Sequence, residues 1–356
     1  MSLFLTLFPS DPHLRRHLPC TSTLNHAETD RIMKNWIIGL AALTALTPFG
    51  SSFAQTKWDL PTGYGTSSFQ TENVQLFAND VDKATAGKLK ITLHANGSLY
   101  KANEIKRAVQ TGQTAAGEFL LSGSANENAL FGVDSIPFLA SNYTDARKLY
   151  DVSKPALEKL LAGQGIKLLF SVPWPGQSLY SVKEIKGPED LKGTKMRAYN
   201  PATTRIAQML KAQPTTIQLA ELGQALATGT VENFLTSSAS GVENKLFEQT
   251  KFFYPVNAWL PRNATVVSQK AFDALDKPTQ EAVMKAAAAA EARGWAISAQ
   301  KDSDFVKELG AKGMKIAPPS PALSKELQTI GQTMTADWLK TAGTEGQGIV
   351  TAFRSK

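Results

Sequence analysis

The residue whose type and position best fit a chemical task is Arg197. It stands in the segment Lys195-Met196-Arg197-Ala198-Tyr199, which reads as a short strand and breaks at Asn200-Pro201, where a helix is expected to begin. In open α/β sheets ligands bind beyond the carboxyl ends of the strands, so Arg197 is placed where a ligand would lie. A guanidinium presents a planar fork that matches a carboxylate, which a lysine cannot do. We therefore expect Arg197 to bind a carboxylate, and the alternative is an ordinary surface ion pair.

The segment 33–54 reads as an export signal. A lysine follows Met33, a largely apolar run of 14 residues occupies positions 36–49, and the small residues Ser52 and Ala54 stand before an expected cut. A membrane anchor is the competing interpretation, but this run is interrupted by a glycine and a proline and is shorter than the roughly 20 residues that a spanning helix needs. We therefore expect a cleaved signal peptide and a periplasmic protein.

Residues 1–32 lie upstream of this complete signal and show neither a helical nor a strand period. We expect them to be disordered and to be translated from a start codon assigned too early. The mature protein would then run from Gln55 to Lys356.

The side-chain types present in residues 55–356 argue against catalysis. The single cysteine and three of the four histidines precede residue 33, so His94 alone remains. A thiolate nucleophile, a Cys-ligated zinc and a two-histidine metal site are thereby excluded. His94 lies in an alternating run and reads as an outward-facing or hydrogen-bonded side chain. No Gly-x-Ser-x-Gly elbow occurs, and no motif points to paired carboxylates for glycoside hydrolysis. We expect no enzyme, no cofactor and no metal.

The charge pattern excludes nucleic acid as a partner. The chain has a net charge of +7, and residues 1–54 contribute one positive charge, which leaves +6 on residues 55–356. The excess is spread along the sequence and no run of five basic residues occurs, so the basic patches typical of nucleic-acid binding are missing. A mild positive field would instead help to draw in small anions.

Strand-like and helix-like patterns alternate along the chain. The expected strands are 89–95, 166–172, 195–199 and 215–219, and the expected helices are 103–111 and 202–210. Such alternation favours α/β layers with mostly parallel sheets. A mature chain of this length favours two lobes, because single cores stop growing at about 250 to 300 residues.

One long helix is expected to begin near Asp276-Lys277-Pro278, where the acid can cap and the proline suits a first turn. Its apolar face is formed by residues spaced by four and three positions, which are Val283, Ala287, Ala290, Gly294 and Ile297. A helix that continues to Leu309 would be about 50 Å long at roughly 1.5 Å per residue. Such a helix would extend beyond one lobe and brace two.

The segment from Gly187 to Pro201, with its turn, its glycine stop and Arg197, resembles the core of the DctP-type solute-binding proteins of TRAP transporters, the tripartite ATP-independent periplasmic systems. Further segments that agree are 86–91, 97–99, 104–113 and 136–139. The similarity covers essentially the whole mature chain, and the arginine segment is its most specific part.

This resemblance implies a two-lobed periplasmic binding protein fold of the α/β class, with strands that cross the hinge and a long helix that braces both lobes. Lobe 1 would comprise residues 55–174 and 263–302, and lobe 2 residues 175–262 and 303–356. It implies that Arg197 pairs with the carboxylate of a small organic acid in an interlobe cleft. It also implies delivery of the ligand to the small and large TRAP membrane subunits, driven by an ion gradient.

The sequence departs from the commonest family pattern at one place. Many members read Gly-Val-Val-Asp-Gly followed by a polar residue and a glutamate, whereas this chain reads Gly-Thr-Val-Glu-Asn-Phe-Leu-Thr-Ser-Ser over residues 229–238. Ligand identity therefore cannot be transferred from the members that bind sialic acid or C4-dicarboxylates. The chain does resemble a subgroup with a Phe-Leu-Thr-Ser run at this position.

The remaining expected ligand contacts come from five regions around the cleft. They are Tyr64 and Ser67 in the first loop, Trp174 and Gln177 near the first crossing, Asn200 beside the arginine, Phe234, Thr236 and Ser237 in the substituted loop, and Trp259 and Asn263 near the return crossing. Large aromatic residues more often pack in cores, which is the alternative for both tryptophans and for Phe234. Arg262 could supply a second positive group or point outward at the hinge.

Two questions stay open at this stage. The alternative function is that of an ABC-type or sensor-linked periplasmic binding protein for another solute, and the neighbouring genes would distinguish it. A single carboxylate with aromatic neighbours favours a smallish monoacid, such as a 2-oxo acid, an aromatic acid or a cyclic amino-acid derivative. The sequence does not tell the identity of the ligand, the oligomeric state, the true start codon or whether a metal ion assists ligand binding.

Overall fold

The computed structural model describes residues 55–355, whose strands form three sheets. The strands are β1 (Thr56–Pro61), β2 (Leu89–His94), β3 (Ala116–Leu120), β4 (Ile166–Pro173), β5 (Ser178–Ser181), β6 (Lys195–Ala198), β7 (Gln213–Thr216), β8 (Asn233–Thr236), β9 (Phe252–Tyr254), β10 (Arg262–Ser268) and β11 (Lys315–Ile316). The predicted signal segment 33–54 and residues 1–32 lie outside the described residues.

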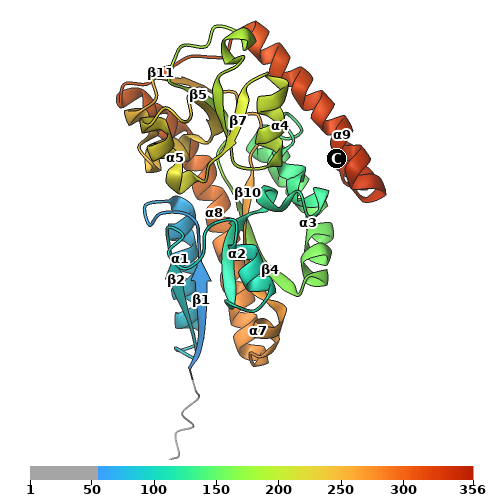
Figure 1. Cartoon of the computed structure of the whole chain (residues 1–356). Coiled ribbons are helices and arrows are strands. Elements are labelled where there is room, and N and C mark those ends of the chain that lie inside the picture. Colours follow the sequence, from blue (N-terminus) through green and yellow to red (C-terminus); the bar gives the residue numbers. More distant parts are fainter. Residues whose placement is uncertain (1–54, 356) are drawn as a thin grey trace, which may run out of the picture. The chain divides into compact units, whose positions relative to one another are not determined.

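Helices cover the faces of these sheets (Figure 1). The α-helices are α1 (Phe69–Ala84), α2 (Ile105–Gln110), α3 (Tyr143–Gly163), α4 (Pro201–Met209), α5 (Leu219–Ala227), α6 (Ser238–Glu243), α7 (Gln269–Asp273), α8 (Lys277–Ala311) and α9 (Pro321–Ser355). Short 3-10 turns are η1 (Leu121–Ser124), η2 (Ala129–Ser135), η3 (Pro188–Leu191) and η4 (Leu246–Glu248). No helix within residues 55–355 is both long and apolar enough to cross a membrane.

The first lobe is built on the two smaller sheets. β1 and β2 pair in parallel, and β10 lies between β3 and β4 and runs antiparallel to both. The second lobe is built on the six-stranded sheet, in the order β11-β9-β5-β8-β6-β7. The structure is therefore two-lobed, and each lobe mixes helices with its own sheet strands.

Two of the segments that connect the lobes are hydrogen-bonded to each other. The chain leaves the first lobe after β4 and returns to it at β10. Between these points, the Trp174 amide donates to the Pro261 carbonyl at 2.8 Å, and the Gln177 amide donates to the Trp259 carbonyl at 2.8 Å. Paired crossing segments of this kind can act as a hinge, because few residues need to change their backbone angles. The residue boundaries predicted for the lobes stay a proposal.

The expectation of mostly parallel sheets is wrong. β6 is parallel to β7 and β8, and β9 is parallel to β11, but β5 runs antiparallel to both β8 and β9. β10 is antiparallel to both its neighbours. The reason is that β5 and β10 directly follow the lobe crossings, so they enter their sheets from the hinge side.

The predicted elements are otherwise confirmed, with shifts at their ends. Strand 89–95 is β2, helix 103–111 is α2, strand 166–172 is β4, strand 195–199 is β6 and helix 202–210 is α4. The strand expected at 215–219 begins earlier, at Gln213, and ends at Thr216 because α5 begins at Leu219. The proline at position 214 is tolerated because β7 is the edge strand of its sheet.

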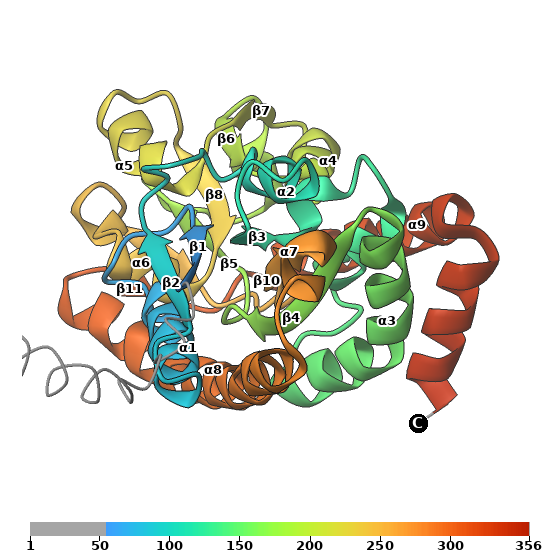
Figure 2. The same ribbon diagram turned by 90° about the horizontal axis from the view of Figure 1, so that it is seen from below.

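The predicted long helix is α8, and it contacts elements of both lobes. The Asp276 carboxylate accepts a hydrogen bond from the Thr279 amide and caps its first turn. The helix packs on α1 and β4 in the first lobe and on α6 and β11 in the second (Figure 2). Gly294 allows a close approach, since a Cβ there would lie 2.4 Å from a Val172 methyl group.

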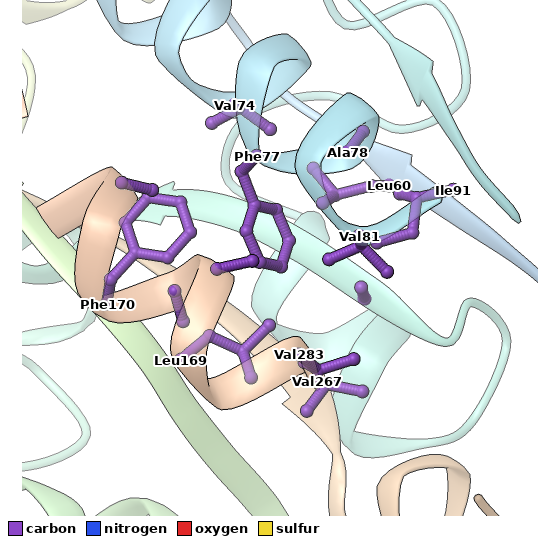
Figure 3. Packing of buried hydrophobic residues seen from close by; sticks show 14 of the residues in the cluster. Leu60, Val74, Phe77, Ala78, Val81, Ile91, Leu169, Phe170, Val267 and Val283 are labelled. Atoms are coloured by element: carbon purple, nitrogen blue, oxygen red, sulfur yellow. The ribbon is translucent and has the colours of Figure 1, made fainter. Parts of the chain in front are cut away.

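The core of the first lobe lies between α1, α8 and the strands. Phe77 of α1 meets Phe170 of β4 edge-on, with ring centroids 5.1 Å apart (Figure 3). Val283 of α8 and Val267 of β10 lie in the same buried cluster. Burial of each such side chain contributes about 1.5–3 kcal/mol. The apolar face predicted for the long helix is therefore the face that packs on this lobe.

Candidate functional site

A cleft of about 670 Å³ opens between the two lobes. The first lobe lines it with Tyr64, Glu118 and Leu120, and the second lobe lines it with residues of β6, β7, α4 and α5. A smaller pocket of about 40 Å³ shares Tyr64, Leu120, Arg197, Tyr199 and Leu219 with this cleft and adds Trp174, Gln177, Thr236, Ser240 and Pro261. Arg197 lines both spaces, so it stands where the wide cleft narrows.

Arg197 is placed there by the end of β6. Its neighbours in the sheet are Thr215 of β7 and Phe234 of β8. The strand stops because Asn200 caps α4, its side chain accepting a hydrogen bond from the Thr203 amide at 2.8 Å, and Pro201 occupies the first helical position. The predicted strand end and helix start are thus confirmed.

The Arg197 guanidinium is buried and lacks a carboxylate partner. The residue is 3% exposed, its Nε donates to the Ile217 carbonyl at 2.9 Å, and its guanidinium carbon lies 4.8 Å from the centre of the Tyr199 ring. Within residues 55–355 no acidic side chain forms an ion pair with it. Burial lowers the pKa of Arg197 to about 10, so the group is still charged at neutral pH. A buried cation held this way can bind an anion.

Tyr199 and Gln177 are hydrogen-bonded to each other beside Arg197. The Tyr199 hydroxyl donates to Gln177 Oε1 at 2.8 Å, and Gln177 Nε2 donates to the Pro175 carbonyl at 3.2 Å. The first of these bonds joins the second lobe to the crossing segment. Burial raises the pKa of the Tyr199 hydroxyl above its usual range, so this hydroxyl stays a donor at neutral pH.

Asn263 orients three side chains of the first lobe. Its Oδ1 accepts from Trp174 Nε1 at 3.0 Å and from the Tyr64 hydroxyl at 3.2 Å, and its Nδ2 donates to Glu118 Oε1 at 3.1 Å. The Tyr64 and Trp174 rings also pack together, with centroids 4.9 Å apart. Asn263 itself is fully buried and does not line the cleft, so it acts as a positioning residue.

Asn200 lines the cleft and also joins the two lobes. Its Nδ2 donates to the Ser122 hydroxyl of η1 at 2.8 Å, while its Oδ1 caps α4. Both ends of this amide are therefore occupied by protein groups. The structure thus brings together, around the cleft and its inner pocket, the predicted residues Tyr64, Trp174, Gln177, Arg197, Asn200 and Thr236.

Four predicted contacts lie elsewhere. Phe234 is fully buried and stacks on Tyr180 at 4.9 Å, and Trp259 is fully buried in the second-lobe core. Ser237 caps α6 by accepting a hydrogen bond from the Ser240 amide at 3.1 Å. Ser67 is exposed and lines a small side pocket that borders the cleft at Tyr64 and Leu219. Phe234 and Trp259 thus serve packing, and Ser237 serves capping because β8 is followed at once by α6.

Arg262 takes neither of the roles considered for it. It is 2% exposed, and its Nε donates to Asp134 Oδ2 at 3.2 Å, while its backbone amide donates to the same oxygen at 3.0 Å. Its guanidinium also lies over the Tyr150 ring, 4.5 Å from the centre. The group therefore points into the protein and not outward, and its charge is already paired.

His94 is part-exposed and lies at the end of β2, with its Nε2 2.7 Å from Asp59 Oδ1, which agrees with the prediction of a hydrogen-bonded histidine. Within the part of the chain that the structure describes, no three His, Cys, Asp or Glu side chains gather as metal ligands.

Sequence reasoning missed Glu118 and Tyr199 as lining residues. Tyr199 could have been found, because it stands two positions after Arg197 and strand residues two apart share a face. Glu118 is the single acidic residue in the apolar stretch Ala115-Ala116-Gly117-Glu118-Phe119-Leu120. A lone carboxylate in a buried strand is a recognisable signal for a functional group.

Relatives of this chain are solute-binding proteins. Residues 62–341 match the family model DctP, bacterial extracellular solute-binding protein, family 7. The 2,3-diketo-L-gulonate-binding periplasmic protein YiaO of Escherichia coli is 28% identical over 295 residues, which cover 78% of this chain and 85% of that protein.

Solved structures agree with this assignment. DctP6 of Bordetella pertussis, an extracytoplasmic solute receptor that binds pyroglutamic acid, is 50% identical, and the match has a TM-score of 0.83 and covers 85% of this chain and 100% of that one. A TRAP solute-binding protein from a marine metagenome, specific for pyroglutamate, is 42% identical with a TM-score of 0.83, over 85% of this chain and 99% of that one. Family and neighbours are receptors and not enzymes, and the ABC-type alternative is set aside. This chain belongs to the DctP family of TRAP-type extracytoplasmic solute-binding proteins.

Proposed function

We propose that this protein is a periplasmic TRAP receptor for a small cyclic organic monoacid of the pyroglutamate type, and that Arg197 pairs with the ligand carboxylate. The observation that carries this proposal is the buried Arg197 guanidinium, which lines the interlobe cleft without an acidic partner among residues 55–355. Such a group leaves its fork free for an anion from outside the protein.

The inner pocket favours a monoacid, since Lys106, the other buried cation that lines the wide cleft, is already paired with Glu127. The inner pocket at Arg197 is about 40 Å³ and is otherwise lined by aromatic, apolar and neutral polar residues. A second buried guanidinium, Arg262, is already occupied by Asp134, so a second ligand carboxylate would lack an equivalent partner there. A compact ligand with one carboxylate and an apolar ring fits these surroundings.

The relatives support the same ligand class. DctP6, DctP7 and the marine metagenome protein, which are 50%, 39% and 42% identical to this chain, are each described as binding pyroglutamic acid or pyroglutamate. YiaO, at 28% identity, is named for a different organic acid, 2,3-diketo-L-gulonate. Pyroglutamate is therefore the first compound to test.

The proposal includes export and delivery. The signal-like segment 33–54 would direct the chain to the periplasm, where residues 55–356 would bind the ligand. The loaded receptor would then dock on the small and large membrane subunits of a TRAP transporter. The genes beside this one test the partner: genes for two membrane subunits without an ATPase are expected, and a sensor kinase in their place would contradict delivery.

Two measurements on the protein purified from the periplasm test the ligand. Calorimetric titration measures binding, and thermal unfolding with and without the compound measures stabilisation. We expect pyroglutamate to bind and to stabilise the fold, by about 2.7 kcal/mol at a hundred times its dissociation constant. Neutral sugars and amines are the controls and should leave the melting temperature unchanged. Stabilisation by neutral or cationic compounds alone would reject the carboxylate receptor.

A further inference from the structure

The cleft also holds a buried acidic residue, Glu118, on the lobe opposite Arg197. It lies in β3 of the first lobe, is 1% exposed and lines the same cleft. Among the described residues no lysine or arginine forms an ion pair with it. Arg197 and Glu118 are therefore buried on opposite sides of one cleft and are not paired with each other. The other buried cation that lines this cleft, Lys106, is already paired with Glu127.

The hydrogen bonds around Glu118 fix which of its neighbours donate. Trp174 Nε1 can only donate, and it donates to Asn263 Oδ1 at 3.0 Å. The Asn263 amide is thereby oriented, so its Nδ2 must donate to Glu118 Oε1, at 3.1 Å. The Thr62 hydroxyl donates to the other carboxylate oxygen, Oε2, at 2.5 Å. Asn263 and Thr62 thus both donate hydrogen bonds to Glu118, which acts as the acceptor in each.

Glu118 keeps capacity for a further donor. A carboxylate has about four acceptor positions, and the structure fills two of them, one on each oxygen. A buried carboxylate with few donors is costly, because its lost hydration is not replaced. Burial accordingly raises the pKa of Glu118, while the bonds from Thr62 and Asn263 oppose that rise. A ligand donor that enters the cleft would complete the set.

We infer that Glu118 accepts a hydrogen bond from a ring N–H of the ligand, while Arg197 binds the ligand carboxylate. This inference rests on the proposed function and adds the second recognition element. It assigns the ligand to acids that carry an N–H group close to the carboxylate, as in a five-membered lactam acid. Tyr64 lines the cleft together with Glu118 and Arg197, and it would contact the ring.

The expected selectivity follows from the loss of one donor. In the lactone acid of the same shape, a ring oxygen replaces the N–H, so a lone pair faces the Glu118 carboxylate. The carboxylate is then unpaired and repelled in a closed site, whereas the contact at Arg197 is unchanged. Sites built to bond a polar hydrogen reject such analogues strongly, because their buried groups are left unsatisfied.

The test is calorimetric titration of the wild-type protein with pyroglutamate and with 5-oxotetrahydrofuran-2-carboxylate, its lactone analogue. We expect the lactone to bind at least about 100-fold more weakly. In Glu118→Gln the ratio of the two dissociation constants should fall below about 10, because the glutamine amide can donate to the ring oxygen. The ratio within one protein is insensitive to a reduced active fraction.

Glu221→Gln is the matched control. Glu221 lines the same cleft but is exposed, so this variant removes one negative charge without removing a buried acceptor. Its lactam-to-lactone ratio should stay within about threefold of wild type, because exposed charges act weakly. Circular dichroism and the melting temperature verify that both variants fold.

The outcomes separate the two proposals. Absence of pyroglutamate binding to the wild-type protein would remove the proposed ligand class itself. Tight pyroglutamate binding together with lactone binding within threefold would overturn the role of Glu118 and leave Arg197 untouched. This second comparison needs only the wild-type protein, so it decides the matter even when Glu118→Gln does not fold.

Discussion

Two arginines, Arg197 and Arg262, are buried to a similar extent in this protein but differ in their partners. They are 3% and 2% exposed. Arg262, at the start of β10, is bonded to Asp134 through its Nε and its backbone amide. Arg197, near the end of β6, has a carbonyl oxygen and a tyrosine ring as partners but no carboxylate among residues 55–355. Burial alone therefore does not tell a structural arginine from a binding arginine.

The comparison teaches that the missing partner is the informative feature. A buried ion pair restores part of what its charges lose on leaving water. In the empty receptor, a buried cation without an anion has lost its hydration without compensation. A ligand carboxylate would provide that compensation. We therefore expect the two arginines to respond in opposite ways to substitution.

The largest loss of stability is expected from Arg262→Ala. This change leaves the Asp134 carboxylate buried without its cation, which costs about 3–5 kcal/mol of unfolding free energy. Urea denaturation monitored by circular dichroism measures it. The double variant Arg262→Leu with Asp134→Leu is the control and should recover most of the loss, since no charge then remains buried. Equal losses in the single and double variants would mean that packing, and not the pair, stabilises this site.

The converse result is expected from Arg197→Ala. Binding of pyroglutamate should weaken at least about 100-fold, which is about 2.7 kcal/mol. The unfolding free energy of the empty protein should fall far less than in Arg262→Ala, because no buried carboxylate is left without its cation. Arg197→Lys should recover only part of the affinity, because a point charge lacks the fork. Binding within threefold of wild type in Arg197→Ala would end the anchor assignment.

Gly294→Ala tests how closely α8 packs on the first lobe, which holds Arg262 but not Arg197. The added methyl would lie 2.4 Å from Val172, so the helix must shift, at a cost of about 1–3 kcal/mol. Gly310→Ala is the matched control in the same helix, where the new methyl meets only Ile316 at 3.6 Å. It should be neutral or slightly stabilising. Similar melting temperatures for the two variants would show that the seat of α8 is not tight.

The smallest effect is expected from Glu243→Gln, which should change how the free energy of unfolding varies with pH. Glu243 of α6 accepts from the Phe69 amide at 2.9 Å, and burial raises its pKa to about 7 from 4.5, opposed by Lys301 and helped by Glu72. In this pH window the folded state binds more protons than the unfolded state, so the contribution of Glu243 to stability falls as pH rises.

Glutamine keeps an acceptor for the Phe69 amide and removes the titration. The stability of Glu243→Gln relative to wild type should therefore increase from pH 4.5 to pH 7 and then level off. Urea midpoints measured at several pH values across this window provide the check. Parallel curves for the two proteins would show that Glu243 has an ordinary pKa.

Local sequence patterns were sufficient for several elements. The cap at Asp276 and the apolar spacing through Gly294 predicted α8, and the break at Asn200-Pro201 placed Arg197 at a strand end. These features succeed because periodicity, capping and proline geometry act over a few residues of chain. The directions of the strands were predicted wrongly from such local patterns, because the direction of a strand depends on which lobe the chain has just left.

The sequence by itself determined the strand end that carries Arg197, the long helix and the family of the chain. Only the tertiary structure decided that Arg262 is paired and Arg197 is not, because Asp134 lies 128 residues from Arg262 in the chain. It likewise decided that Phe234 packs inside the second lobe and that Asn263 orients Glu118 from 145 residues away. Contacts between distant residues leave no local pattern, so the partners of a buried charge are known only once the chain has folded.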